Sequence, residues 1–137
     1  MNTPDRVTLG GTPVDIHRLR VEVAEAQKQF SNVELRLTAQ SEPYAKVALQ
    51  TSAGGVYVLS VFFDGYPNRM PQVRVDAPSL QSPPHRYKDG HICYMHPSMW
   101  NPGIHNLTFV IARAAKWLNK YEVWKRTQYW PGAEIQH

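Results

Sequence analysis

The spacing of apolar residues changes several times along this 137-residue chain, and these changes constrain the fold more than any other feature. Over residues 14–30 apolar side chains recur every three or four positions, which predicts a helix with one apolar face. We expect Thr12 to cap this helix, Pro13 to occupy its first turn, and Asp15 to lie favourably at the positive end of its dipole. The first long element is therefore predicted to be helical.

The period then changes to two, which is typical of strands with one wet face. From Val33 apolar and polar residues alternate, and the alternation continues at Val47 and Leu49. The β-branched and aromatic run at 56–63 predicts a central strand, and the alternation at 72–77 predicts a fourth strand. Because Gly-containing turns separate these runs, we expect a four-stranded antiparallel meander.

No period is visible from about residue 78 to residue 106, and prolines interrupt any regular element there. Loops of this length inside a compact domain are uncommon and are usually functional when ordered. The only cysteine of the chain, Cys93, lies in the middle of this stretch. The loop is therefore the candidate location of the functional site.

A helical stripe resumes after Asn106, which is a good capping residue. Arg113, Lys116 and Lys120 fall outside this apolar stripe. The tryptophans at 117, 124 and 130 are expected to cover the sheet or to bury the tail. A second long helix is therefore predicted to follow the loop.

The bulk composition is that of a globular protein, with 42% hydrophobic and 19% charged residues and no long apolar run. We expect one domain over residues 1–137 and no membrane span. The start of the chain lacks the pattern of a secretory signal, and one cysteine cannot form an internal disulfide, so a cytoplasmic location is expected. The net charge of +4 is spread out, which does not predict nucleic-acid binding.

Three short motifs resemble those of ubiquitin-conjugating enzymes, and they occur in the order and on the elements expected of that family. The first carries a Tyr-Pro pair, a spaced proline and a valine, the second a Gly-x-Ile-Cys segment, and the third a Trp-x-Pro segment. The residues that match are Tyr66, Pro67, Pro71 and Val73, then Gly90, Ile92 and Cys93, and then Trp100, Asn101 and Pro102. The resemblance covers roughly residues 13 to 125.

This resemblance implies an α+β fold of the ubiquitin-conjugating type, with an N-terminal helix, a four-stranded meander, a long cysteine loop and a C-terminal helix. Only about ten residues follow the second long helix, so the usual last two helices of the family are lacking. The family's Asn eight residues before the cysteine is replaced by His85. The end of the chain is similar to divergent bacterial ubiquitin-conjugating-like proteins of antiphage (CBASS-type) and ubiquitin-like conjugation operons.

By resemblance, Cys93 accepts an activated protein C-terminus as a thioester from an adenylating activating enzyme and transfers it to an amine of a protein target. The accepted protein is ubiquitin-like or CD-NTase-like, and no cofactor or metal is implied. His85 is expected to act as oxyanion donor or, alternatively, as the base for the amine proton. The resemblance makes Gly90, His91, His96, Trp100, Asn101 and Pro102 supporting loop residues, and Arg18, Arg20 and Lys28 contacts for the activating enzyme.

Two alternatives to the enzyme hypothesis remain open on the residues alone. Free cysteine is among the most buried residue types, so Cys93 could be inert packing in a catalytically inactive binding module of the same fold. Cys93 and the histidines around it also have spacings that could hold zinc in a small zinc-stabilised domain; these are His85, His91, His96 and His105. The enzyme hypothesis predicts that the Cys93 sulfur is accessible in a shallow groove, and a sulfur sealed beneath side chains would contradict it.

Overall fold

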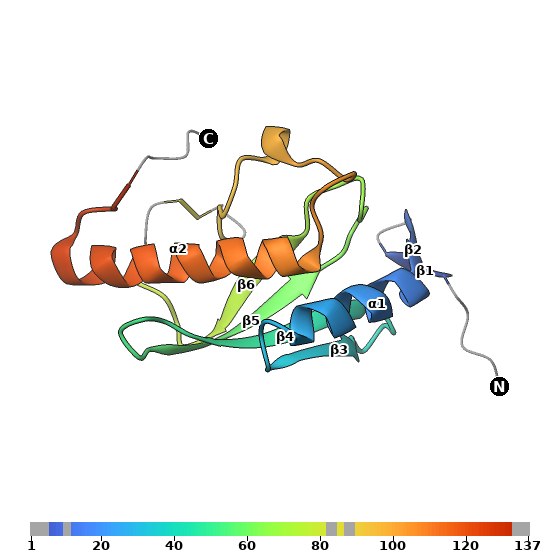
Figure 1. The fold of residues 1–137 in the computed structure, drawn as a ribbon, viewed down its shortest axis with the longest axis horizontal. Helices are drawn as coiled ribbons and strands as arrows, with labels where there is room; N and C mark the ends of the chain where they lie inside the picture. Colours follow the sequence, from blue (N-terminus) through green and yellow to red (C-terminus); the bar gives the residue numbers. More distant parts are fainter. Residues whose placement is uncertain (1–5, 10–11, 82–84, 87–89, 133–137) are drawn as a thin grey trace.

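The computed structural model describes residues 6–9, 12–81, 85–86 and 90–132, and its fold is drawn in Figure 1. A two-stranded hairpin precedes a helix, a four-stranded antiparallel sheet and a second, longer helix. The elements are β1 (Arg6–Leu9), β2 (Thr12–Asp15), α1 (Ile16–Gln27), β3 (Val33–Leu37), β4 (Pro43–Gln50), β5 (Val56–Phe62), β6 (Gln72–Ala77), a short 3-10 helix (Pro97–Met99) and α2 (Leu107–Thr127).

The sheet is the predicted meander, because its strands lie in the order β3-β4-β5-β6 and every neighbouring pair is antiparallel. Val47 pairs with Val33 on one side and with Leu59 on the other. Every second residue of β4 is buried, as the period of two requires; these residues are Pro43, Ala45, Val47 and Leu49. The alternation read from the sequence thus corresponds to one buried face.

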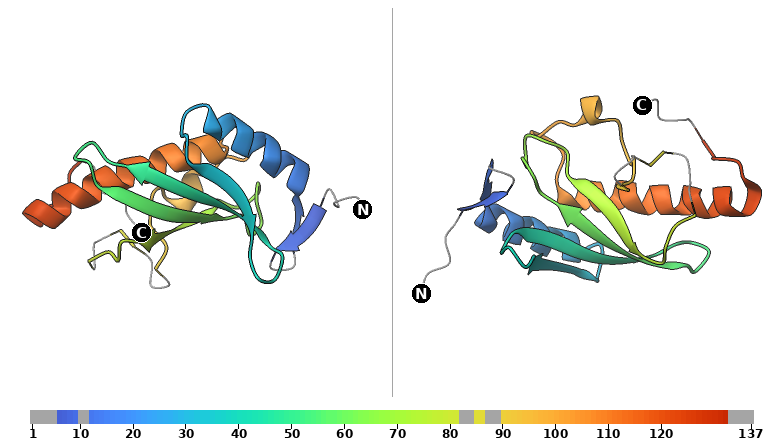
Figure 2. Two further views of the ribbon diagram at one scale, coloured as in Figure 1. Left: turned by 90° about the horizontal axis from the view of Figure 1, so that it is seen from below. Right: turned by 180° about the vertical axis from the view of Figure 1, so that it is seen from behind.

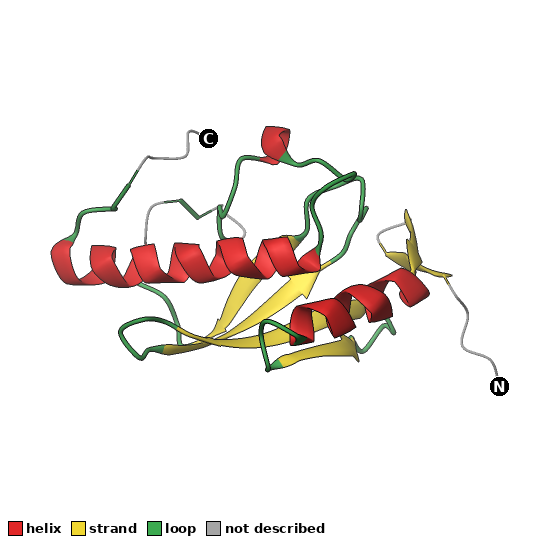
Figure 3. Ribbon diagram, in the orientation of Figure 1, coloured by secondary structure: helices red, strands yellow, loops and turns green. Residues whose placement is uncertain are grey.

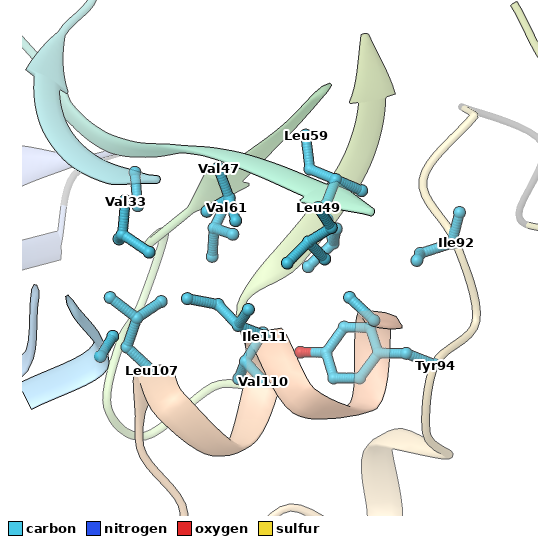
Figure 4. Packing of buried hydrophobic residues seen from close by; sticks show 14 of the residues in the cluster. Val33, Val47, Leu49, Leu59, Val61, Ile92, Tyr94, Leu107, Val110 and Ile111 are labelled. Atoms are coloured by element: carbon cyan, nitrogen blue, oxygen red, sulfur yellow. The ribbon is translucent and has the colours of Figure 1, made fainter. Parts of the chain in front are cut away.

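The core lies between this face of the sheet and the helices (Figures 1 and 2). In the close view of Figure 4, valine and leucine side chains of the sheet point toward the first turns of α2. Leu107, Val110 and Ile111 supply the helical side of this contact, and each is at most 1% exposed. Burial of such apolar area is the main stabilising contribution, at about 25 cal/mol per Å².

The start of α1 differs from the prediction. Thr12 and Pro13 belong to β2, where they pair with Leu9 and Thr8 of β1, and the helix begins only at Ile16. Asp15 is the cap, and its side chain accepts a hydrogen bond from the backbone N–H of Arg18 at 3.2 Å. The sequence signals for capping were local, whereas the hairpin depends on pairing with residues further upstream.

The long loop is confirmed between β6 and α2 (Figure 3). In the part of it that the structure describes, regular structure is limited to the 3-10 helix Pro97–Met99 and one antiparallel bridge between Arg86 and Ile92. The predicted second helix is also confirmed. Asn106 is its N-cap, and the side chain of Asn106 accepts a hydrogen bond from the backbone N–H of Phe109 at 3.0 Å.

Candidate active site

Two buried residues hold the cysteine segment against the body of the protein. Ile92 is fully buried, and its backbone N–H donates to the carbonyl of Val73 in β6 at 2.8 Å. Tyr94 is 2% exposed, and its hydroxyl donates to the carbonyl of Pro71 at 2.5 Å. Because successive side chains of an extended segment point to opposite sides, Cys93 is directed away from its two anchors.

His85 and Cys93, the two residues predicted to be catalytic, lie together. The backbone N–H of Cys93 donates to the carbonyl of His85 at 2.8 Å. That same carbonyl accepts a hydrogen bond from the indole Nε1 of Trp117 in α2 at 3.3 Å. The backbone of His85 has a φ of +60°, a left-handed conformation that is uncommon for residues other than Gly, although Asn, Asp and His adopt it more often than the rest.

The expectation that the Cys93 sulfur is accessible is wrong for this structure, in which Cys93 is 2% exposed. Its pocket has a volume of only about 20 Å³, close to the space that one water molecule needs. Trp130, from the segment that follows α2, lines the pocket together with His85 and Trp117. The indole of Trp130 is 8% exposed and lies 5.3 Å from the Trp117 ring, between centroids.

The cover over the cysteine comes from a part of the chain far away in sequence. Figure 1 shows residues 128–132, in red, turning back over α2 after the helix ends. The turn occurs at Gln128, which has a φ of +61°. Trp130 is thereby brought to the cysteine segment, which explains why no local pattern around Cys93 indicated its burial.

Three cations of α2 complete the pocket around Cys93, namely Arg113, Lys116 and Lys120. Arg113 Nε donates to the carbonyl of Tyr94 at 3.3 Å. Burial, and then the charges of Lys116 and Arg113, lower the pKa of Lys120. In the sequence these cations fall outside the apolar stripe, and nothing there connects them with Cys93. Their spacing of three and four residues is the signal that puts them on one flank of the helix.

Two of the predicted supporting residues lie close to Cys93 in the chain but outside its pocket. Gly90 has a φ of +95°, a backbone conformation that favours glycine. His91 is half-buried and lines a different groove, of about 460 Å³, beside Pro71 and Trp100.

The remaining supporting residues shape the loop after Cys93. His96 caps the 3-10 helix by accepting the backbone N–H of Ser98 at 3.1 Å. Trp100 fastens the loop through Nε1, which donates to the carbonyl of Pro67 at 2.7 Å. Asn101 accepts the N–H of Gly103 at 2.9 Å and is exposed, as is Pro102. These contacts are structural and do not reach Cys93.

The cations predicted to contact an activating enzyme lie on α1 or, for Lys28, at its C-cap, and none of them lines the cysteine pocket. Arg18 is engaged within the protein, since its Nε pairs with Glu22 at 2.7 Å, and this hydrogen bond raises its pKa. Lys28 is exposed and forms a 3.2 Å ion pair with Glu25. Arg20 is exposed.

The histidines proposed as zinc ligands form no ligand group with Cys93 in the described part of the chain. Among the described residues, no group of three or more His, Cys, Asp or Glu side chains is arranged to hold a metal ion. The histidines near Cys93 in sequence therefore do not converge on it as a ligand set.

None of the helices in the described part of the chain is both long and apolar enough to cross a membrane.

Comparisons with known proteins bear directly on this site. The family model for the type II CBASS E2 protein matches residues 22–137, a range that contains β3 to β6, the cysteine loop and α2. The chain belongs to this family. Type II CBASS E2 membership implies an E2-like conjugation role in antiphage defence.

A solved structure supports the fold of this CBASS E2 protein. The match is to the complex of the Vps23 UEV with ubiquitin, with a TM-score of 0.52 and 14% sequence identity, covering 74% of this chain and 81% of that chain. At this identity the likeness shows the ubiquitin-conjugating-type fold alone. No curated protein sequence matches the chain.

Proposed function

We propose that Cys93 accepts the activated C-terminus of a ubiquitin-like or CD-NTase-like protein as a thioester and transfers it to an amine of a protein target. The observation that carries the proposal is the backbone pairing of Cys93 with His85 beside a pocket lined by three cations of α2. Membership of the CBASS E2 family and the fold support it. Cationic neighbours favour the thiolate, which is the form that attacks.

Two steps of the reaction follow from the residues in the pocket. The thiolate of Cys93 attacks the carbonyl carbon of the incoming thioester, and the thiolate of the activating enzyme leaves. The amine of the target then attacks the new thioester and releases Cys93. His85 supplies either a hydrogen bond to the tetrahedral oxyanion or a base for the amine proton, and a donor of this kind contributes about 3–4 kcal/mol in other enzymes.

The buried state of Cys93 adds a requirement to this mechanism. A pocket of about 20 Å³ has no room for a peptide, so residues that line it must move before the thioester can form, and we propose that Trp130 is one of them. The structure therefore corresponds to a resting form of the proposed enzyme. Trp130 belongs to a short segment after a helix end, and such segments open at low free-energy cost.

The direct test uses the fact that Cys93 is the only cysteine of the chain. Incubation with an adenylating activating enzyme, ATP and the modifier should give an adduct that thiols cleave. Cys93→Ala should abolish this adduct, and Cys93→Ser should give an ester that resists thiols. If the adduct forms unchanged in Cys93→Ala, the proposal fails.

For the contact with the activating enzyme we propose the exposed cations of α1 and its C-cap. Arg20 and Lys28 are the cations that we propose for docking, because Arg18 pairs with the largely buried Glu22 whereas the pair of Lys28 with Glu25 is exposed. Arg20→Glu should slow the loading of Cys93 by the activating enzyme. It should not change the reaction of Cys93 with a small thioester, which needs no docking.

A second function is favoured by the burial of Cys93. A non-enzymatic module would bind a ubiquitin-like protein without using the thiol, and a solved structure of similar fold is that of a UEV in complex with ubiquitin. This alternative predicts ATP-independent binding of the modifier that is equally strong in the parent and in Cys93→Ala. It also predicts no thiol-sensitive adduct with a cognate activating enzyme.

A further inference from the structure

One flank of α2 carries a concentration of positive charge next to the cysteine. Arg113, Lys116 and Lys120 are three and four residues apart, which places them on the same side of the helix, and we call them the basic strip. All three line the pocket that contains Cys93. Lys116 is exposed, and the other two are half-buried. The charge is therefore available to a molecule that approaches the thiol.

The positive charge of the basic strip is not neutralised within the described part of the protein. The ion pairs formed there use Arg18, Lys28, Arg36 and Lys46, and none involves the basic strip. The lowered pKa of Lys120 has burial as its first cause and repulsion from the other two cations as the next. Grouping like charges in this way is unfavourable for the folded protein alone, and a bound anion would relieve it.

We propose that the basic strip binds acidic side chains in the C-terminal segment of the protein that Cys93 accepts. This inference rests on the proposed function and specifies the chemistry of the modifier. From Arg113 to Lys120 the strip rises by seven residue steps, or about 10 Å at 1.5 Å per residue. An extended peptide covers that length with about three residues. The acidic residues should thus lie within about five positions of the C-terminal carbonyl.

A short acidic peptide fits the basic strip better than a nucleic acid does. Proteins that bind single strands combine a basic groove with exposed aromatic rings on which bases stack. The rings beside the strip, Trp117 and Trp130, are 3% and 8% exposed and pack on each other. The basic strip also lies beside the Cys93 thiol, and in the proposed function a peptide carbonyl is the group that must reach that thiol.

The basic strip takes no part in bond making. In the loading step the Cys93 sulfur forms a bond to the carbonyl carbon, and the bond from that carbon to the sulfur of the leaving thiol breaks. The leaving sulfur takes the electron pair and the proton that Cys93 released, and nothing is oxidised or reduced. The cations raise the local concentration of the acidic segment and orient its carbonyl.

Binding can be tested with two fluorescein-labelled peptide amides of identical composition. One carries Asp and Glu within five residues of its C-terminus, and the other carries them at its N-terminus behind a spacer of Gly and Ser. At 20 mM salt we expect the first peptide to bind about tenfold tighter by fluorescence anisotropy, because three exposed ion pairs of ordinary strength combine. A small thioester joined to each C-terminus in place of the amide makes the same pair reactive.

A matched pair of variants locates the effect on the basic strip. Lys116→Glu should remove the preference for the first peptide. Lys125→Glu makes the same change of charge at another exposed position of α2, outside the pocket, and should leave the preference intact. The preference should also fall below about threefold at 1 M salt, where screening acts over about 3 Å.

Three results would overturn the proposal. The isomers could bind equally, Lys125→Glu could act as strongly as Lys116→Glu, or a 20-nucleotide single strand could bind more tightly than the first peptide in a way that Lys116→Glu abolishes.

Acylation of Cys93 by the two peptide thioesters, followed by mass spectrometry, separates this proposal from the proposed function. If Cys93 is acylated without preference, the strip proposal fails alone. If the binding preference is present but neither thioester acylates the parent or Trp130→Ala, the proposed function fails and the strip remains.

Discussion

The indole of Trp130 lies against the imidazole of His85, with ring centroids 5.0 Å apart, and both rings line the pocket of Cys93. Two residues separated by 45 positions thus meet over the only cysteine of the chain. If the cysteine is the nucleophile, this contact is the first one that must break. It also links the environment of His85 to the position of the tail.

Removal of the Trp130 indole should expose the thiol. We expect Trp130→Ala to raise the rate of Cys93 alkylation by iodoacetamide by at least about tenfold, because a small opening then suffices. Tyr129→Ala is the matched control, since Tyr129 is the neighbouring aromatic residue and is 77% exposed. Its alkylation rate should equal that of the parent.

The dependence of alkylation on urea distinguishes a local cover from general instability. Opening of the tail exposes little surface, so the alkylation rate of Trp130→Ala should change only weakly between 0 and 1 M urea. A dependence as steep as that of global unfolding, measured by circular dichroism, would mean that the variant has merely been destabilised.

The two substitutions of His85 should have different effects. His85→Asn keeps a hydrogen-bond donor, and Asn tolerates the left-handed backbone of this position, where φ is +60°. It should retain transfer to lysine within about tenfold of the parent. His85→Ala loses the donor and should slow transfer by about 10²–10³-fold. Single-turnover discharge of the loaded protein measures both rates, and equal rates for Ala and parent would remove His85 from the mechanism.

The buried carboxylate of Glu22 should matter strongly for stability. It accepts hydrogen bonds from the hydroxyl of Tyr66 and from the backbone N–H of Leu107 at 2.8 Å, and so joins α1 to the start of α2. Glu22→Ala leaves both buried donors without this partner and should lower the free energy of unfolding by about 2–4 kcal/mol. Urea unfolding measures the loss.

A control on the same helix separates this effect from a loss of charge. Glu25→Ala removes an exposed carboxylate whose partner is Lys28, and such pairs contribute about 0–1 kcal/mol. Tyr66→Phe should lower the free energy of unfolding by an amount between those of Glu22→Ala and Glu25→Ala, about 1–2 kcal/mol. Equal losses for Glu22→Ala and Glu25→Ala would contradict the role assigned to the Glu22 contacts.

Stability should fall in alkaline solution because of Tyr57. Burial, followed by the nearby Glu122 and Tyr121, raises the pKa of Tyr57 to about 12. The unfolded chain has an ordinary tyrosine pKa of about 10, so it loses its proton first as pH rises. The contribution is thus complete below pH 10 and is lost between about pH 10 and 12. Urea midpoints should fall as pH rises from about 10 to 11, and less steeply in Tyr57→Phe.

Much of the fold could be predicted because its elements have clear periods. The alternation at Val33, Val47 and Val73 reports one buried face, and each of these residues is at most 1% exposed. The apolar stripe that begins at Leu107 likewise indicates the face of α2 that packs against the sheet. The hairpin of β1 and β2 was missed, since Thr12 and Pro13 are also good residues for the start of a helix.

The candidate site was predicted in part. The motifs around Cys93 brought His85 into consideration through its position in the chain, and the structure places the two residues within one backbone hydrogen bond. The same motifs also pointed to Trp100 and Asn101, whose contacts serve the loop itself. Motif spacing indicates which residues a family shares, but it does not indicate which of these residues lie close to the Cys93 sulfur.

The sequence alone determined the order of the elements, the position of the cysteine loop and the family to which the chain is similar, because these depend on local period and on short motifs. Only the tertiary structure decided that the thiol is covered, that Trp130 covers it, and that Arg113, Lys116 and Lys120 surround it. The physical reason is that burial and local charge are set by whichever distant segments pack against an atom, and this packing leaves no mark on the residues next to it in the chain.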